Sequence, residues 1–245
     1  WNIVKPDVVI STPAGVTMTE RRAVTNAALE AGAKNAYVVR EPLLAALGAG
    51  ITINSSSGNM IVNMGGGTSE VAVISLGGIV AWSSIRVAGN KFDQAIIDYV
   101  KKKYMLSIGE QTAEAAKIAI GGAMPLKEKR EFQIRGRDLI SGLPKDLTLN
   151  SNEIADALNP LLMDIAASVQ SVFNETPPEL VADVMEKGII LSGGSAGLRD
   201  IDAFFKRLLG VPTYVAEESI LCVAKGSGII LEHLDVYKRT LLQKR

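Results

Sequence analysis

The segment from Asn63 to Glu70 reads NMGGGTSE and joins two apolar stretches, residues 60–63 and 70–76. Glycine has no Cβ, so three in a row let backbone N–H groups close on an anion and let φ become positive. Because the flanking stretches have the length and composition of strands, the glycines predict a hairpin turn. This arrangement excludes the Walker loop and the dinucleotide fingerprint, which both need a helix N-terminus. Two interpretations remain, a plain turn or a phosphate-binding loop.

Strand and helix signals alternate along the chain, which indicates an α/β fold. Thr17 and Glu20 have capping-box spacing, and Glu41-Pro42 has the composition of a helix start. We expect Gly77-Gly78 to form a two-residue hairpin turn and Asn90 to cap a helix. The expected strands are 7–11, 37–39, 60–63, 70–76, 79–84, 188–191 and 213–215, and the expected helices are 17–31, 41–48, 90–103, 112–120, 151–176, 200–209 and 219–234.

Charge and cysteine content bear on partners and compartment. Lys plus Arg and Asp plus Glu both number 26, so the formal net charge is zero and nucleic acid is not expected as a partner. Cys222 is the only cysteine, which excludes a disulfide within the chain and fits a reducing cytoplasm. The chain has no apolar run long enough to span a bilayer and no signal peptide. Since it starts at Trp1 and soon enters an apolar strand, we expect an N-terminally truncated chain.

Three further segments carry candidate site residues, each with a plainer alternative. Glu114 and Lys117 share one predicted helix face, so they could hold a ribose by its hydroxyls or form only a surface ion pair. Gly193-Gly194 follows a strand and suits close approach to a base or a phosphate, although many strand–helix connections contain such a pair. Glu41 could orient an attacking water or could only complement the dipole of its helix.

Taken together, these motifs resemble the MreB family of bacterial actins, which belongs to the actin-like ATPase superfamily. The resemblance covers essentially the whole chain. The motifs that carry it are EPLLAALG at 41–48, GGGTSEVAVISLGG at 65–78, RVAG at 86–89, GRDL at 136–139, GLP at 142–144, TPPEL at 176–180 and VAKG at 223–226.

The resemblance implies an actin-like, ribonuclease H-like α/β fold in which two α/β domains flank a nucleotide cleft. Residues 1–55 and 226–245 would belong to the first large domain, with the polar loop 54–58 as its boundary. Residues 56–91 and 156–225 would form the second large domain, and 92–155 its small subdomain. The first part of the fold, including the first phosphate hairpin of the family, would lie before residue 1.

The resemblance also implies roles for single residues, with ATP and Mg²⁺ as cofactors. Glu41 matches the glutamate that positions the hydrolytic water, and Thr68 joins it as a catalytic candidate. In the family a short apolar loop inserts into the lipid surface, and Ile3 and Val4 match its two apolar residues. The implied nucleotide contacts are the phosphate loop Gly65, Gly66, Gly67 and Thr68, the ribose and adenine contacts Glu114, Ala115, Ala116 and Lys117, and the turn beneath the adenosine, Gly193, Gly194, Ser195 and Ala196.

Departures from the family pattern bear on the metal. Asn63 and Asn90 stand where the family has Asp, and Ser195 stands where it has a third glycine. Asn keeps an oxygen acceptor near Mg²⁺ but lacks the charge. At 4 Å and an effective dielectric near 20, one unit charge is worth about 4 kcal/mol before solvent compensation. The sequence therefore predicts a phosphate loop with weakened, indirect metal handling at Asn63.

The resemblance implies an ATP-binding, filament-forming cytoskeletal protein that sets cell shape by organising cell-wall synthesis. Its expected partners are other copies of itself, the inner face of the cytoplasmic membrane and the cell-wall synthesis machinery. It would be cytoplasmic and peripheral at the membrane. The alternatives are a catalytically weakened nucleotide-binding scaffold, an ATPase whose purpose is turnover, and a chaperone or sugar kinase of the same superfamily. The truncated chain by itself is expected to be inactive in ATP hydrolysis.

Overall fold

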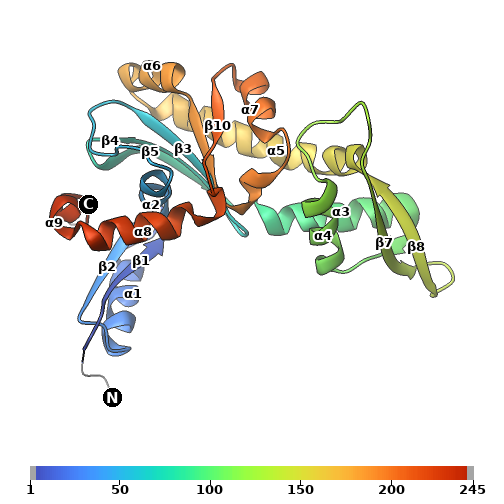
Figure 1. Cartoon of the computed structure of the whole chain (residues 1–245), viewed down its shortest axis with the longest axis horizontal. Coiled ribbons are helices and arrows are strands. Elements are labelled where there is room, and N and C mark those ends of the chain that lie inside the picture. Colours follow the sequence, from blue (N-terminus) through green and yellow to red (C-terminus); the bar gives the residue numbers. More distant parts are fainter. Residues whose placement is uncertain (1–3, 242–245) are drawn as a thin grey trace.

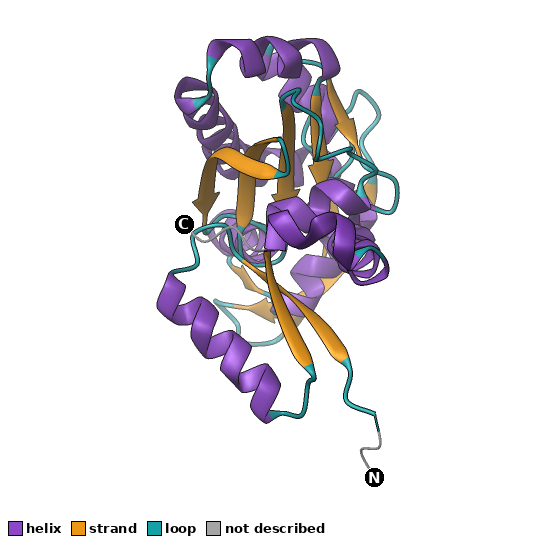
Figure 2. Cartoon of the chain, turned by 90° about the vertical axis from the view of Figure 1, so that its left-hand side faces the viewer, coloured by secondary structure: helices purple, strands orange, loops and turns teal. Residues whose placement is uncertain are grey.

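The computed structural model describes residues 4–241, and the side chains of residues 4–237. The chain begins with a small α/β unit at one end of the molecule (Figure 1). In it β1 (Asp7–Thr12) and β2 (Asn35–Arg40) pair in parallel, and α1 (Met18–Glu30) connects them. Figure 2 shows α1 alongside these two strands. The predicted capping box is confirmed, because Thr17 Oγ1 accepts from the Glu20 N–H and the Glu20 carboxylate accepts from the Thr17 N–H.

The N-terminal and C-terminal parts of the chain meet where α2 (Glu41–Gly48) crosses α8 (Cys222–Glu232). Both crossing positions are glycines. A Cβ on Gly48 would come within 1.8 Å of the Cys222 carbonyl oxygen, and one on Gly226 within 2.0 Å of the Leu44 carbonyl oxygen. The backbones therefore approach too closely for any larger residue, and this contact fixes α8 against the N-terminal part of the chain.

The central sheet has the strand order β10-β9-β3-β4-β5. The strands β3 (Asn59–Met64), β4 (Ser69–Ser75) and β5 (Gly78–Ile85) form an antiparallel meander, whereas β9 (Ile189–Ser192) and β10 (Thr213–Val215) continue from β3 in parallel. Successive β3 side chains alternate between two cores. Met60, Val62 and Met64 pack in the core that contains α5 (Ser151–Glu175), and Ile61 packs in the core that contains α2. The sheet is thus covered on both faces.

The hairpin between β4 and β5 corrects the sequence-based turn. We expected Gly77-Gly78 at its centre, but Ser75 pairs with Gly78, so the two central residues are Leu76 and Gly77. Both have positive φ, 51° and 75°. Positive φ at both central positions is the type I′ geometry that matches the twist of a tight hairpin, and here it forces a leucine into the left-handed region.

A smaller unit at the other end of the molecule follows the meander (Figure 1). It contains α3 (Gly89–Tyr104), β6 (Leu106–Ser107), α4 (Glu110–Ile120), β7 (Glu131–Asp138) and β8 (Pro144–Asn150), with the strands in the order β6-β7-β8. Asn90 does not cap α3. The cap position belongs to Ala88, and Asn90 lies inside the first turn, where its N–H donates to the Gly66 carbonyl at 2.8 Å. The expected cap is replaced by the Gly loop itself.

The remaining elements complete the molecule. α6 (Pro178–Lys187), the 3₁₀ turn η1 (Gly194–Gly197) and α7 (Ile201–Leu209) flank β9, and η2 (Ser219–Leu221) follows β10. The single helix expected over 219–234 is instead η2, α8 and α9 (Leu234–Leu241), because His233 leaves the helical region at φ −127°. Within residues 4–241, none of the helices is long and apolar enough to cross a membrane.

Candidate nucleotide site

The Gly loop is a tight turn between β3 and β4, closed by a hydrogen bond of 3.0 Å from the Gly65 N–H to the Thr68 carbonyl. The carbonyl groups of the loop accept hydrogen bonds from other segments of the chain. Gly65 O accepts from the Gly89 N–H at 3.1 Å and from Ser195 Oγ at 2.9 Å. The loop is therefore anchored to the start of α3 and to the turn η1, and the anchoring turns these carbonyls toward the protein.

The loop borders a cavity of about 580 Å³. Nine of the residues expected at a nucleotide site line this cavity, although they come from four separate segments of the chain. The expected residues that line the cavity are Glu41, Asn63, Gly65, Gly66, Glu114, Lys117, Gly193, Gly194 and Ser195. A cavity of this size with glycine-rich turns on its wall suits a ligand the size of a nucleotide.

Five expected contacts lie outside the cavity lining. Ala116 and Ala196 are buried in the hydrophobic core, since each sits on the inner side of its turn or helix. Ala115 and Gly67 are exposed to solvent, and Thr68 is half-buried. Each of the expected segments therefore contributes some of its residues to the cavity lining, and the rest face the core or the solvent.

Asn63 is the centre of a polar cluster at the end of β3. Its side chain is buried, with 2% of the residue exposed. Its amide nitrogen donates to Glu41 Oε1 at 2.8 Å, and its amide oxygen accepts from Ser192 Oγ at 3.0 Å. An ionised aspartate could not donate to a carboxylate, so this hydrogen bond depends on the amide of Asn63. The oxygen of Asn63 points to Ser192 rather than to the Glu41 carboxylate.

Glu70 is a buried carboxylate close enough to feel the charge of Glu41, and the sequence reasoning did not consider it, although it does not line the cavity. It is 1% exposed, and its two carboxylate oxygens lie 3.1 and 3.3 Å from the Ala14 nitrogen, which donates to them. Burial raises the pKa of Glu70 to about 7, and the charge of Glu41 adds to the increase, while hydrogen bonds from Ala14 and Ser84 oppose it. A glutamate inside a strand buried on both faces was the signal that could have identified it.

Lys117 pairs with a carboxylate that sequence spacing did not predict. Its ammonium group is 2.8 Å from Asp93 Oδ1 and donates to Oδ2 at 3.0 Å. No ion pair joins Glu114 to Lys117 among the described residues, so the alternative of a surface ion pair between them is not observed. Asp93 lies on α3 and also lines the cavity. The charge of Lys117 is therefore held at the joint between α3 and α4, beside the Gly loop.

The turn after β9 requires glycine at its first position. Gly193 has φ +85°, and a Cβ there would come within 2.2 Å of the Met64 carbonyl oxygen. This close approach seats the turn against the end of β3. Ser195, at the position where the resemblance implies a third glycine, donates its hydroxyl to Gly65 O at 2.9 Å. This hydrogen bond links the two glycine turns.

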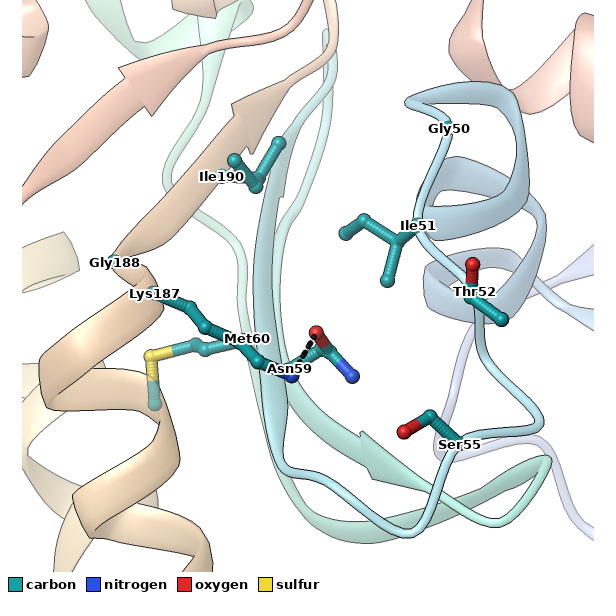
Figure 3. A pocket seen from close by; sticks show the side chains of 9 residues that line it. All are labelled: Gly50, Ile51, Thr52, Ser55, Asn59, Met60, Lys187, Gly188 and Ile190. Carbon is teal, nitrogen blue, oxygen red and sulfur yellow. Dashed lines mark hydrogen bonds between the residues drawn. The ribbon is translucent and has the colours of Figure 1, made fainter.

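A second cavity, of about 320 Å³, lies apart from the Gly loop, between the 50–55 segment and the start of β3 and β9 (Figure 3). None of the residues expected at a nucleotide site lines it. Lys187 reaches across its opening to Asn59, 3.5 Å from Oδ1. In the described part of the chain, no group of three or more His, Cys, Asp or Glu side chains could hold a metal ion.

The strand order, the two glycine turns and the cavity between them define an α/β protein of the actin-like class. The family model described as "MreB/Mbl protein" matches residues 1–239. The chain therefore belongs to the MreB/Mbl family.

Relatives within this family are similar over most of the chain. The cell shape-determining protein MreB of Escherichia coli K12 is 46% identical over 232 residues, which are 95% of this chain and 67% of that protein. The cell shape-determining protein Mbl of Bacillus subtilis is 45% identical over 231 residues, 94% of this chain and 69% of that protein. The chain spans about two thirds of the length of these relatives.

Solved structures agree with the assignment. MreB5 of Spiroplasma citri bound to AMPPNP has a TM-score of 0.90 and 40% identity, over 94% of this chain and 69% of that one. The same protein bound to ADP has a TM-score of 0.91 and 41% identity, over 95% and 70%. The MamK double helical filament, with a TM-score of 0.78 and 21% identity over 93% and 69%, supports the fold alone.

Proposed function

We propose that this chain is the nucleotide-binding part of a filament-forming bacterial actin that determines cell shape. The observation that carries the proposal is the cavity between the Gly loop and the turn at Gly193, because it brings together nine residues expected from the family pattern. The names of the relatives support a cell-shape role, and they do not support a chaperone or a sugar kinase. Filament formation by self-association follows from the same family membership.

The proposed ligand is ATP, in keeping with the nucleotides bound to MreB5. Gly65 and Gly66 would face its phosphates, and Glu114 and Lys117 its sugar and base. The turn at Gly193 would lie beneath the adenosine. Glu41 would orient the attacking water, since its carboxylate lines the cavity beside the Gly loop. Gly67 and Thr68 belong to the loop but do not line the cavity, so their proposed role is to maintain the conformation of the loop.

The cavity also fits Mg²⁺ carried by the nucleotide. Mg²⁺ usually keeps several waters and takes one or two carboxylates together with substrate phosphates. Glu41 supplies one such carboxylate, and the amide of Asn63 keeps that carboxylate in place. When bound, the ion would neutralise charge on the phosphates. The neutral Asn63 adds no charge of its own, which supports the expectation of weakened metal handling.

The proposal includes a location and a partner. The intact protein would be cytoplasmic and peripheral at the inner membrane surface, and it would act with the cell-wall synthesis machinery. Val4 is 80% exposed, as a lipid-inserting side chain must be. Ile3, the other expected contact, lies outside the described residues. The test is co-sedimentation of the intact protein with liposomes, with and without Val4→Ser. Equal lipid binding by filaments of both proteins would refute the membrane contact.

The nucleotide proposal is tested by ATP binding and by ATP-dependent pelleting of the intact protein that contains this chain. Glu114→Ala removes an exposed side chain that lines the cavity, so we expect about threefold to tenfold weaker ATP binding, the effect of one hydrogen bond. Glu110→Ala, in the first turn of the same helix but outside the cavity lining, is the matched control. The proposal fails if the unaltered protein neither binds ATP nor pellets with it.

A further inference from the structure

The cavity of about 320 Å³ shown in Figure 3 lies at the opposite end of β3 from the Gly loop. One wall is the segment 50–55, which follows α2, and the other wall is formed where β3 and β9 begin. Since β3 and β9 are parallel, and the Gly loop and the turn at Gly193 follow their last residues, the two cavities lie at opposite ends of the same two strands. A ligand in this cavity would contact both the N-terminal part of the chain and the central sheet.

Each of these two walls carries an isoleucine that is only half-buried. Ile51 and Ile190 extend toward the cavity from opposite sides (Figure 3), and both pack against the hydrophobic core that contains α2. Part of each side chain therefore remains in contact with water. An apolar group that covered these two side chains would gain free energy, because apolar surface on both partners would leave water.

The lower edge of the cavity in Figure 3 is polar and carries a positive charge. The side chains of Asn59 and Ser55 lie there, and Lys187 extends toward them from the end of α6. The Lys187 ammonium group donates to Asn59 Oδ1 at 3.5 Å and to Ser57 Oγ. Both acceptors are neutral, so they position the charge of Lys187 at the edge of the cavity without neutralising it.

No carboxylate is paired with this lysine in the described part of the chain. Within residues 4–237, Lys187 forms no ion pair, and neither Asp nor Glu is among the residues that line the cavity. Asp183 lies one turn earlier on α6. Its pKa is lowered mainly by the Gly58 N–H, which donates to its carboxylate at 2.7 Å, and less by the charge of Lys187. A positive charge beside an apolar cavity without acids in its lining favours an anionic ligand with an apolar part.

We propose that this cavity binds a small organic anion that carries an apolar chain. Lys187 would donate to the anionic group at the polar edge, and the chain would lie between Ile51 and Ile190. At roughly 30 Å³ for each non-hydrogen atom, as for liquid water, the volume accommodates about ten such atoms, the size of octanoate. A nucleotide is considerably larger, so this site is separate from the proposed nucleotide site and does not depend on it.

The first test titrates octanoate into the intact protein that contains this chain, followed by ligand-observed NMR. We expect saturable binding with a dissociation constant of about 1 mM, the range for a ligand of this size. The affinity should rise about fourfold for each methylene from butyrate to octanoate, the effect of burying one CH₂, and should rise no further at dodecanoate because the cavity is then full. A rise that continues to dodecanoate would show non-specific adsorption and would overturn the site.

The second test removes the charge. Lys187→Gln keeps an N–H donor for Asn59 at an exposed position, so the variant should remain folded. It should weaken octanoate binding about threefold to tenfold, the effect of one charge-assisted hydrogen bond at an exposed site, and should leave the binding of octanol unchanged. Lys206→Gln, also exposed and in the last turn of α7 but outside the cavity lining, is the matched control.

Hydrogen exchange locates the bound anion. Octanoate should slow exchange of backbone amides in the segments 50–55 and 188–190, which form the two walls, and Lys187→Gln should reduce this protection at equal octanoate concentration. Octanoate that binds Lys187→Gln and the unaltered protein with equal affinity would overturn the proposal. Protection that is absent from both walls would overturn it as well, whether or not the protein binds ATP.

Discussion

Asn63 and Glu41 are joined by a hydrogen bond of 2.8 Å, in which the amide nitrogen of Asn63 donates to Oε1 of Glu41. The bond joins β3 to the first residue of α2 and holds the candidate catalytic carboxylate at the cavity wall. An ionised aspartate at this position could not donate this bond, so the amide of Asn63 orients Glu41 and at the same time brings no negative charge. At position 63, therefore, an amide favours the orientation of Glu41, whereas a carboxylate would favour binding of Mg²⁺.

Asn63→Asp tests that opposition. The change places two carboxylates together, and at 4 Å and an effective dielectric near 20 their repulsion is about 4 kcal/mol before solvent compensation. We expect a lower melting temperature in EDTA, recovery with Mg²⁺ and ATP, and faster hydrolysis with a steeper Mg²⁺ dependence in the intact protein. Asn54→Asp, in an exposed loop, is the control. Unchanged melting and unchanged metal dependence would show that the charge at this site is irrelevant.

Glu41→Gln separates catalysis from architecture. A glutamine oxygen still accepts from the Asn63 amide, so the polar cluster should persist and ATP without Mg²⁺ should bind as before. Loss of the carboxylate should reduce hydrolysis about 10²- to 10⁴-fold, the usual contribution of a general base. Single-turnover hydrolysis and ATP affinity, measured on the same preparation, check both statements. Hydrolysis at the unaltered rate would exclude Glu41 as the residue that orients water.

The sequence was sufficient where structure is set locally. The capping box at Thr17 and Glu20 and the helix start at Glu41-Pro42 depend on neighbours within one turn, and both are present. The glycine hairpin was likewise correct, because apolar strands flank it. The turn at Leu76 and Gly77 was misplaced by one residue, since register across β4 and β5 and not the glycine pair decides which residues form the turn.

The site chemistry depends on contacts that spacing does not reveal. Asn63 and Glu41 are 22 residues apart, and Glu70 and Ala14 are 56 apart. Helical spacing paired Lys117 with Glu114, yet the fold brings Asp93 from another helix to it. A sequence pattern can assign a residue to a helix face, but it cannot say which other element packs against that face.

Gly193→Ala should be severely destabilising. The added methyl group would meet the Met64 backbone at 2.2 Å, and φ is +85°, where side chains are strained. The atoms it would meet all belong to the backbone of Met64, which cannot rotate away, so we expect a loss of at least about 2 kcal/mol in the free energy of unfolding. Gly197→Ala, at the end of the 3₁₀ turn that follows Gly193 and with nothing within 4 Å of its Cβ, should lose little. Urea unfolding of both variants measures the difference in stability between them, and equal midpoints would contradict the packing argument.

Glu70 should make stability depend on pH. Because its pKa rises from 4.5 to about 7 on folding, the folded state holds the proton more tightly than the unfolded state. This contribution is fully present below pH 4.5 and is lost as the pH rises through 7, by at most about 3 kcal/mol. Glu70→Gln keeps an acceptor for the Ala14 N–H without the charge, so it should flatten the fall in unfolding free energy between pH 5 and pH 8. Glu128→Gln, at an exposed position, should keep the fall, and an unchanged slope in Glu70→Gln would assign the pH dependence to another group.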